Sequence, residues 1–375
     1  MGLLDKMSNV WVNEYKKRVT AVTKDLESQG IDIALIPTGT NFQYLAGYSY
    51  NSMERLSLLI LRDGECSLFV PGLMEDQVRE NTWIGDIVVW RDHENQYQVL
   101  RNYLGATPKN VIGIEGSLSF SHLAGIFQSK VPSDVRLIDD IFSRIRSVKS
   151  EAEIKLIGEA IKRSESSLLK TLPELKEGIT EAEIARTLEW NFIDEGLAKP
   201  SFGSIVAFGG NGALPHHEPG KRKLKKGDSV VIDFGGSYEE YCSDTTRTFF
   251  FGEPDPEFVK AYGTVRQAQE NAMAIVTDFA RYSDLDVAAR SELRNAGYGE
   301  MNIRLGHGVG LDVHEAPFLV PSNSGTVQNG AVFTVEPGIY RSGRFGIRLE
   351  DTTYVKNGKC VSFNGLIKEY DLKKM

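Results

Sequence analysis

The sequence predicts two domains, an α/β domain over residues 1–146 and an α+β domain over residues 147–375. The first observation is length, because 375 residues exceed what one hydrophobic core usually serves. The second is that short, branched apolar runs alternate with helical segments in the N-terminal part, which is typical of an α/β domain. The third is that two helices followed by two β-like runs occur twice in the C-terminal part, which indicates a duplicated architecture.

The N-terminal domain begins with a helix that we expect from about Asn13 to Gly30, with Gly30 as its C-cap. The runs that we expect to form strands are IDIALIP, LSLLILRD, CSLFV, DIVVW, NVIGIEG and VRLID. Between them we expect helices at Met74–Glu80, Glu94–Tyr103 and His122–Lys130. This part contains neither a GxGxxG motif nor a P-loop, so no motif predicts a nucleotide site here.

Two capping boxes mark helix starts in the second domain. Ser150 precedes Glu153, and Thr180 precedes Glu183, which is the hydroxyl-to-carboxylate spacing of a capping box. The first β-like pair, SVVIDFGG and TTRTFFFG, follows these two helices. The remaining elements are helices expected at Pro256–Asp278 and Ser283–Asn295 and the β-like runs AVFTVEPGIY and FGIRLEDTTYV.

Composition excludes several classes of function. The formal net charge of −8 disfavours nucleic-acid binding, which usually requires a basic face. No apolar run approaches the length of a membrane span, so we expect no membrane association. Three scattered cysteines, Cys66, Cys242 and Cys360, fit a reducing compartment better than a disulfide framework. We therefore expect a soluble, cytoplasmic protein.

Acidic residues stand inside or beside apolar β-like runs of the second domain. Asp233 ends one run of the first pair and Asp244 begins the other, so a turn between them can bring both carboxylates to one face. Glu336 and Glu350 repeat this arrangement in the second pair, and His307 lies between the two halves. Buried carboxylates are costly unless paired or metal-bound, and converging ones repel one another. This set suits divalent ions, and two ions that share carboxylates are a known device of aminopeptidases.

Each of these residues also has an ordinary structural interpretation. Any single acid fits a solvated strand end, Glu336 before Pro337-Gly338 fits a turn, and GHGVG fits a flexible loop or a phosphate-binding segment. The combination argues against those interpretations. Four of the six histidines lie in the same segments as the acids, namely His216, His217, His307 and His314.

Five motifs in this order carry a resemblance to a known family: ALPHHEPG, VIDFGGSYEEYCSDTTRTF, GHGVGLDVHEAP, VEPGIY and GIRLED. The sequence resembles the pita-bread metallopeptidases, which include Xaa-Pro aminopeptidases, prolidases (Xaa-Pro dipeptidases) and methionine aminopeptidases. The N-terminal part resembles the creatinase-like domain of the Xaa-Pro enzymes, which methionine aminopeptidases usually lack. The resemblance implies a creatinase-like α/β domain, a pita-bread catalytic domain, and hydrolysis of the bond between an N-terminal residue and proline.

The resemblance also implies a metal site. Asp233, Asp244, His307, Glu336 and Glu350 match the family's ligands for two divalent ions, with manganese or cobalt expected and zinc as a third candidate. Asp244 and Glu350 match the bridging carboxylates. Glu336 also matches the residue that accepts the proton of the attacking water, which is a general-base role.

Further matches concern the substrate. His216 matches a histidine that contacts the substrate near the scissile carbonyl, and His314 matches one that meets the developing oxyanion. Arg348 matches an arginine that orients the carboxylates, whereas His217 receives at most a supporting role. At the position of Phe318 some prolidases carry an arginine for the dipeptide carboxylate.

Phe318 therefore indicates an apolar contact with the substrate. Without an arginine at this position, we expect the chain to accept Xaa-Pro-Yaa peptides at least as well as Xaa-Pro dipeptides. The exception is that Arg341 or Arg344 binds the dipeptide carboxylate instead. The resemblance also implies a homodimer, in which the aromatic segment NFQYLAGYSYNSMERL lines the mouth of a site, either its own or the partner's. Two alternatives stay open. The first is another hydrolase on the pita-bread fold, such as a metal-free amidinohydrolase. The second is a non-catalytic member of the family that binds other proteins.

Overall fold

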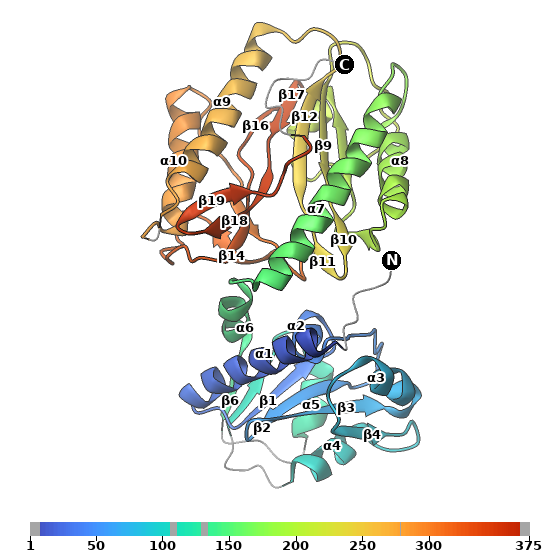
Figure 1. Cartoon of the computed structure of the whole chain (residues 1–375). Coiled ribbons are helices and arrows are strands. Elements are labelled where there is room, and N and C mark those ends of the chain that lie inside the picture. The colour runs from blue at the N-terminus through green and yellow to red at the C-terminus, as the bar shows by residue number, and fades with distance from the viewer. Residues whose placement is uncertain (1–7, 106–110, 129–133, 278, 368–375) are drawn as a thin grey trace. The chain divides into compact units, whose positions relative to one another are not determined.

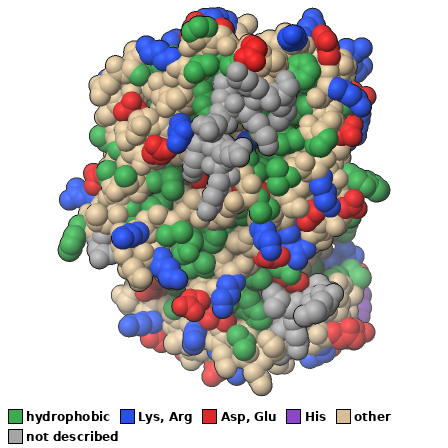
Figure 2. Space-filling view, turned by 45° about the horizontal axis from the view of Figure 1, so that its top comes forward, with side chains coloured by type: hydrophobic (Ala, Val, Ile, Leu, Met, Phe, Trp, Pro, Cys, Tyr) green, Lys and Arg blue, Asp and Glu red, His purple; other side chains and the backbone are tan. Residues whose placement is uncertain are grey.

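The computed structural model describes residues 8–105, 111–128, 134–277 and 279–367, and it divides into two compact units between Ile145 and Arg146 (Figure 1). Lys130 and Asp278, which were expected to end helices, lie outside the described residues. None of the described helices is long and apolar enough to cross a membrane. On the face shown in Figure 2, acidic and basic side chains are intermingled.

The first unit is built on a six-stranded sheet in the order β4-β3-β2-β1-β5-β6. The β1–β2 and β2–β3 pairs are antiparallel and the other pairs are parallel, so the predicted α/β character is confirmed. All six apolar runs form strands. They are β1 (Ile33–Pro37), β2 (Leu58–Arg62), β3 (Glu65–Pro71), β4 (Ile87–Trp90), β5 (Val111–Ile114) and β6 (Asp134–Leu137).

Helices cover this sheet. Leu100 and Leu104 of α4 and Ile126 of α5 pack in one apolar cluster with Ile33 and Leu35 of β1. The helices are α1 (Asn9–Ser28), α2 (Thr40–Ala46), α3 (Glu75–Asn81), α4 (Gln96–Leu104), α5 (Phe120–Phe127) and α6 (Asp139–Arg146), with a 3-10 turn η1 (Gly72–Met74). The segment taken as an aromatic loop therefore begins as α2, and α6 was not predicted.

The first half of unit 2 contains the helices that begin at the two predicted capping boxes. In both boxes the hydroxyl of the N-cap residue accepts a hydrogen bond from the backbone N–H of the glutamate at N3. The side chain of that glutamate accepts a hydrogen bond from the backbone N–H of the N-cap residue. Helices α7 and α8 pack on the sheet β12-β9-β8 through one apolar cluster. The elements are α7 (Glu151–Thr171), η2 (Leu172–Glu174), α8 (Glu181–Asp194), β7 (Lys199–Pro200), β8 (Ile205–Phe208), η3 (Gly209–Ala213), β9 (Ser229–Phe234), β10 (Gly236–Tyr238), β11 (Tyr241–Cys242) and β12 (Thr245–Phe250).

The second half repeats this plan with a second helix pair. Figure 1 shows α7 and α8 flanking one side of the strands and α9 and α10 flanking the other. Strands form the sheet β14-β13-β15-β18-β19 and the hairpin β16–β17. The elements are α9 (Pro256–Ala274), α10 (Tyr282–Asn295), β13 (Gly306–Gly308), β14 (Glu315–Leu319), β15 (Val332–Val335), β16 (Gly338–Arg341), β17 (Phe345–Arg348), β18 (Asp351–Lys356) and β19 (Lys359–Ser362).

The two strand pairs differ from the simple hairpins that the sequence predicted. In the first pair, Thr246 rather than Asp244 lies opposite Asp233, and β10 and β11 form a small hairpin between the two acids. In the second pair, both runs are interrupted, with Glu336 between β15 and β16 and Glu350 between β17 and β18. These breaks leave the two glutamates outside the regular strand ladders, where their side chains can turn toward the first half.

Candidate metal centre

The five residues expected to bind metal come together in unit 2. Their ligand atoms form overlapping triads in which all atoms lie within 4.8 Å of one another. The triads are Asp233–Asp244–Glu350, His307–Glu336–Glu350 and Asp244–His307–His314. Asp244, His307 and Glu350 each belong to two of the three triads, which places them centrally in the cluster.

The two aspartates come from the first half of the unit. Asp233 lies in β9, whose six residues are all buried, and Asp244 directly precedes β12. Branched apolar neighbours on β9 form the core, so the strand holds the Asp233 carboxylate in a dry environment. One of its oxygens, Oδ1, is buried and has no hydrogen-bond partner among the described residues. A buried, unpaired carboxylate oxygen is the signature of an absent partner, here a cation.

A backbone bridge connects the two halves at the site. Thr246 of β12 pairs with Glu350, and the Glu350 amide donates to the Thr246 carbonyl over 3.1 Å. The Thr246 hydroxyl also donates to Glu350 Oε2 over 2.6 Å. Glu350 therefore reaches the aspartates because its break between β17 and β18 is held against the strand that follows Asp244.

His307 has one ring nitrogen directed at the acids. Its Nδ1 lies 3.1 Å from the Gly308 carbonyl oxygen, which can only accept, so Nδ1 carries the proton. Its Nε2 lies 3.3 Å from Glu336 Oε1 and 3.6 Å from Asp244 Oδ2. A neutral imidazole fixed in this way presents a lone pair to the carboxylate cluster, which is the usual arrangement of a metal-binding histidine.

The carboxylates of the cluster are buried and repel one another. Burial raises the pKa of Asp233, and burial with repulsion from the other acids raises the pKa of Asp244 and Glu350 well above their usual values. Burial also acts to raise the pKa of Glu336, but its contact with the His307 ring lowers this pKa overall. Four carboxylates in one buried site favour a bound cation over continued mutual repulsion.

Arg348 supports this cluster from β17. It is buried, and its Nη2 donates to Asp233 Oδ2 over 2.6 Å. Its Nε donates to the Thr246 hydroxyl over 3.0 Å, and its Nη1 donates to the Tyr340 hydroxyl over 3.1 Å. Thr246 in turn donates to Glu350, so Arg348 is connected to carboxylates of both halves. Thr246 and Tyr340 were not predicted, since a hydroxyl in a strand carries no local signal of such a contact.

A cavity of about 760 Å³ opens over the cluster. Its lining includes all five candidate ligands together with His216 and His314. The His314 ring stands edge-on to the ring of His307, with 4.1 Å between their centres. Burial and the neighbouring charges of His307 and Arg304 lower the pKa of His314 to about 4, so the ring is uncharged at neutral pH.

The loop that carries His216 is held by contacts that sequence reasoning missed. Glu181, fully buried at the start of α8, lies 2.9 Å from His217 Nε2 and accepts the Gly220 amide over 3.1 Å. Gly212 packs so closely on Gly346 of β17 that a Cβ on Gly346 would lie 1.6 Å from the Gly212 carbonyl oxygen. His217 therefore connects the loop to Glu181, and both His216 and His217 line the cavity.

Glu315 supports the segment of His314 in a similar way. Its fully buried carboxylate pairs with Arg146 and, over 2.8 Å, with Lys149. Burial alone would raise the pKa of Glu315, but the two cations lower it below its usual value. Nothing in the sequence signals this group, because the partners are separated by more than 160 positions.

Phe318 lies outside the cavity lining, as far as the described residues show. It belongs to β14, opposite His307 in the strand register, and is 39% exposed. Arg341 lies over the Tyr298 ring, and Arg344 pairs with Glu257 over 2.8 Å. Among the described residues, neither of these arginines lines the cavity, whereas Arg304 does.

The fold and site define a class of protein. A duplicated unit with helix pairs outside, strands inside and a buried cluster of four carboxylates and one imidazole is the pita-bread architecture of metal-dependent hydrolases. The model of metallopeptidase family M24 matches residues 155–357, and that of the creatinase/prolidase N-terminal domain matches residues 18–148. The chain belongs to metallopeptidase family M24, with a creatinase-type N-terminal domain.

The chain is similar to three other proteins over nearly its whole length. An uncharacterized peptidase of Staphylococcus aureus is 35% identical over 347 residues, which cover 91% of this chain and 96% of that protein. The crystal structure of a prolidase from Thermococcus sibiricus matches with a TM-score of 0.90, 34% identity and 100% coverage of both chains. An X-Pro aminopeptidase from Thermotoga maritima matches with a TM-score of 0.79 and 34% identity, covering 92% of this chain and 99% of that one.

Proposed function

We propose that this chain is a dinuclear metallopeptidase that hydrolyses the bond between an N-terminal residue and a following proline. The observation that carries the proposal is the set of overlapping triads, with ligand atoms within 4.8 Å, at the base of a cavity of about 760 Å³. Asp233, Asp244, His307, Glu336 and Glu350 would hold two ions, with Asp244 and Glu350 shared between them. Manganese or cobalt suits this oxygen-rich set, and zinc is a third candidate.

The residues present fit such ions. Asp233 Oδ1 is buried without a partner, and the raised pKa values of Asp244 and Glu350 report carboxylates that lack a compensating charge. When bound, the two ions polarise the scissile carbonyl and lower the pKa of a water molecule so that it attacks at neutral pH. Removal of the ions should therefore abolish turnover while leaving the fold in place.

The side chains divide the remaining work. Glu336, whose lowered pKa keeps it ionised, accepts the proton of the attacking water at its carboxylate. His314 donates an N–H to the carbonyl oxygen as negative charge develops there. His216 faces the same cavity on the loop held by His217 and positions the substrate. Apolar side chains in the lining, such as Phe202 and Ile303, suit a pyrrolidine ring, which offers no N–H for recognition.

The named structures support the choice of substrate, since a prolidase and an X-Pro aminopeptidase share the fold at 34% identity. The test is to assay the protein, after chelation and after addition of manganese, cobalt or zinc, on Xaa-Pro dipeptides, Xaa-Pro-Yaa peptides and Met-Ala peptides. We expect metal-dependent release of the first residue from the proline-containing substrates. Activity confined to Met-Ala peptides, or active protein without metal by elemental analysis, would contradict the proposal.

We also propose a homodimer. Aromatic side chains gather at α2 and the segment after it, where the half-buried rings of Tyr48 and Tyr50 stack with 6.0 Å between their centres and the buried Phe42 meets Tyr50 edge-on. Rings with one apolar face and one polar end suit a partly wet protein surface. The proposed role of this group is to line the mouth of a peptidase site, its own or that of a second copy.

A further inference from the structure

A dipeptide substrate ends in a carboxylate one residue beyond the scissile carbonyl, about 4 Å further along the chain. A residue that recognises this charge must therefore lie beside His314, inside the cavity. Phe318 carries no charge, Arg341 lies over Tyr298, and Arg344 pairs with Glu257. The cation has to come from another position in the chain.

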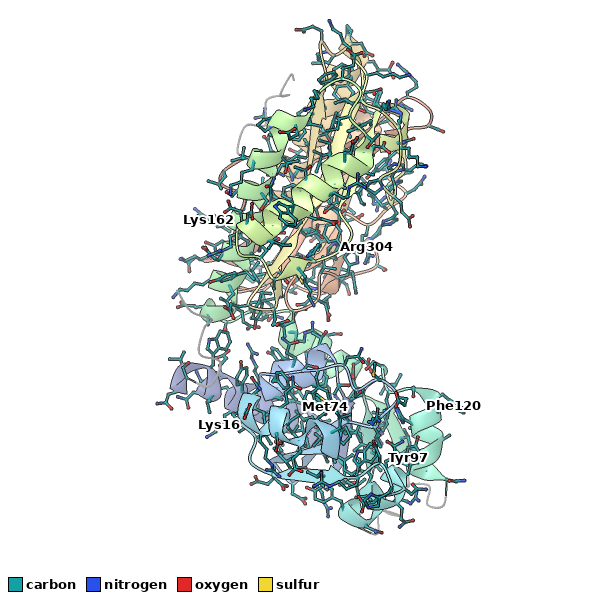
Figure 3. The ribbon with its side chains drawn as sticks, turned by 90° about the vertical axis from the view of Figure 1, so that its right-hand side faces the viewer. Lys16, Met74, Tyr97, Phe120, Lys162 and Arg304 are labelled. Atoms are coloured by element: carbon teal, nitrogen blue, oxygen red, sulfur yellow. The ribbon has the colours of Figure 1, made fainter. Side chains whose placement is uncertain are left out.

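Arg304 meets this requirement. It lines the cavity and lies on the segment just before β13, three positions ahead of His307 (Figure 3). Arg304 and His314 line the same cavity, and the ring that supports Arg304, Phe318, lies opposite His307 in the strand register. The sequence reasoning passed over Arg304, because an arginine beside an apolar residue in MNIRLGHG matches no motif that was considered.

The backbone on both sides of Arg304 is fixed. The Ile303 carbonyl accepts a hydrogen bond from Arg290 Nη2 over 2.7 Å, and Arg290 also binds the Met301 carbonyl. Arg290 is itself held by the buried carboxylate of Asp286. On the other side, the Leu305 amide donates to the Leu319 carbonyl over 3.0 Å. A residue anchored in this way presents its side chain to the cavity from a defined position.

The head group of Arg304 is supported by an aromatic ring. Its guanidinium carbon lies 5.1 Å from the centre of the Phe318 ring, within the range of a cation–π contact. No ion pair or hydrogen bond with another described residue occupies this guanidinium, so its donors remain available to a ligand. Phe318 thus limits where the guanidinium lies and leaves its charge unneutralised.

Other arginines of the cavity are less suited. Arg348 is buried and donates to Asp233, so it belongs to the carboxylate cluster. Arg186 is exposed on α8, and its charge contributes to lowering the pKa of Glu183 on the same helix. Among the arginines of the described lining, Arg304 is the one that rests on the Phe318 ring, beside the strand of His307, with its donors unused.

We propose that Arg304, supported by the Phe318 ring, binds the C-terminal carboxylate of the substrate and makes the enzyme prefer Xaa-Pro dipeptides over longer peptides. A guanidinium can form two parallel hydrogen bonds with a carboxylate, whereas it meets only one oxygen of an amide. This inference rests on the proposed Xaa-Pro peptidase function. It reverses the expectation that Phe318 alone favours tripeptides, because Phe318 acts here through Arg304.

The test compares a dipeptide such as Ala-Pro with its C-terminal amide and with Ala-Pro-Ala, using manganese-loaded enzyme. The readout is the ratio of kcat/KM for the dipeptide to kcat/KM for the amide. We expect Arg304→Gln to lower this ratio about 10-fold to 100-fold, in keeping with the strength of charged hydrogen bonds. Arg304→Lys keeps the positive charge but cannot form two parallel hydrogen bonds with a carboxylate, so it should give an intermediate ratio. Phe318→Leu should lower the ratio less than Arg304→Gln does.

The ratio separates recognition from structural damage, because a variant with a distorted site loses both rates and keeps their ratio. Metal content by elemental analysis and Tm accompany each variant. Arg186→Gln tests the competing arginine and should retain the wild-type ratio. An unchanged ratio in Arg304→Gln, or a loss of preference in Arg186→Gln instead, overturns the inference while the proposed function stands. A manganese-loaded wild type that cleaves none of the three substrates overturns both.

Discussion

Arg348 donates from Nη2 to Asp233 Oδ2 over 2.6 Å, and through Thr246 the same guanidinium is connected to Glu350 on the other half of the unit. One side chain therefore orients a carboxylate from each half. Replacement by lysine keeps the charge but cannot serve Asp233, Thr246 and Tyr340 in their present directions.

We expect Arg348→Lys to weaken metal binding or kcat/KM by about 10–100-fold, which is the usual cost of losing an outer-sphere partner. Manganese titration and elemental analysis measure the first effect, and dipeptide hydrolysis measures the second. Arg344→Lys, at an exposed pair with Glu257, is the matched control. Wild-type metal affinity and rate in Arg348→Lys would show that Arg348 does not orient the ligands.

The shared position of Asp244 and Glu350 in the triads makes a second prediction. Asp244→Asn and Glu350→Gln are nearly isosteric, so the fold should persist by circular dichroism while bound metal falls below the wild-type amount. The loss of activity should exceed the roughly 10–100-fold cost of an outer-sphere change. Glu257→Gln serves as the control, and a fully active Asp244→Asn protein would favour a metal-independent or non-catalytic role for the site.

His314 lines the cavity beside His307 and belongs to one triad with Asp244 and His307, and we propose that it serves the substrate and not the metal. We expect His314→Ala to retain its metal while kcat falls by about 10²–10³-fold, because one oxyanion donor contributes about 2.7–4 kcal/mol in other enzymes. His93→Ala, at an exposed site in the first unit, should leave kcat unchanged. If His314→Ala lost its metal together with its activity, His314 would instead be a ligand.

Glu315 should control stability as a function of pH. Its buried carboxylate has a pKa lowered by Lys149 and Arg146, although burial opposes this, so its contribution to stability is present above the usual value of 4.5 and disappears as the pH falls through the lowered value. Glu315→Gln leaves buried cations without this partner and should cost about 3–5 kcal/mol at neutral pH.

The measurement is the free energy of unfolding of wild type and Glu315→Gln between pH 7 and pH 3. The difference should be largest at pH 7 and should shrink as the pH drops below about 4.5, where the carboxylate of the unfolded chain takes up a proton. It should be lost once the pH has fallen through the lowered pKa of the folded protein. Glu300→Gln, in an exposed pair with Arg294, should change stability by less than about 1 kcal/mol. A difference that stayed constant over this range would contradict the assigned role of the ion pairs.

The proposed dimer predicts twice the chain mass by light scattering. If the aromatic segment after α2 completes a site on the partner, Tyr48→Ser should lower kcat/KM without changing metal content, since Tyr48 stacks on Tyr50 and is not one of the candidate ligands. A monomer with full activity would refute the shared-site version. A dimer whose Tyr48→Ser variant has wild-type kinetics would limit the segment to packing.

Much of the architecture was predictable because its signals are local. Ser150 with Glu153 and Thr180 with Glu183 start their helices through contacts three residues apart, and all six apolar runs of the first unit became strands. The helix at Thr40–Ala46 was not predicted because it is short, contains two aromatic residues and has no side-chain hydrogen bond at its N-cap.

The site was predictable to the extent that acids within apolar runs and a family resemblance mark its ligands. Its supports were not, because they depend on contacts across the fold. Glu181 meets His217 across 36 positions, and Thr246 meets Glu350 across 104. The proposed role of Arg304 depends on its contact with the Phe318 ring, which lies on another strand, and on the hydrogen-bonded backbone around Arg304. No residue pattern within a short window contains that information.

The distribution of the ligands along the chain also determines when the enzyme starts to work. Asp233 and Asp244 belong to the first half of the unit, while Glu336 and Glu350 are made only after another hundred residues or so have been added. During synthesis, a ribosome-bound chain that has not yet produced Glu350 lacks one of the candidate ligands. Peptidase activity thus begins after both halves have emerged and joined, which delays proteolysis until the nascent chain has folded its own catalytic unit.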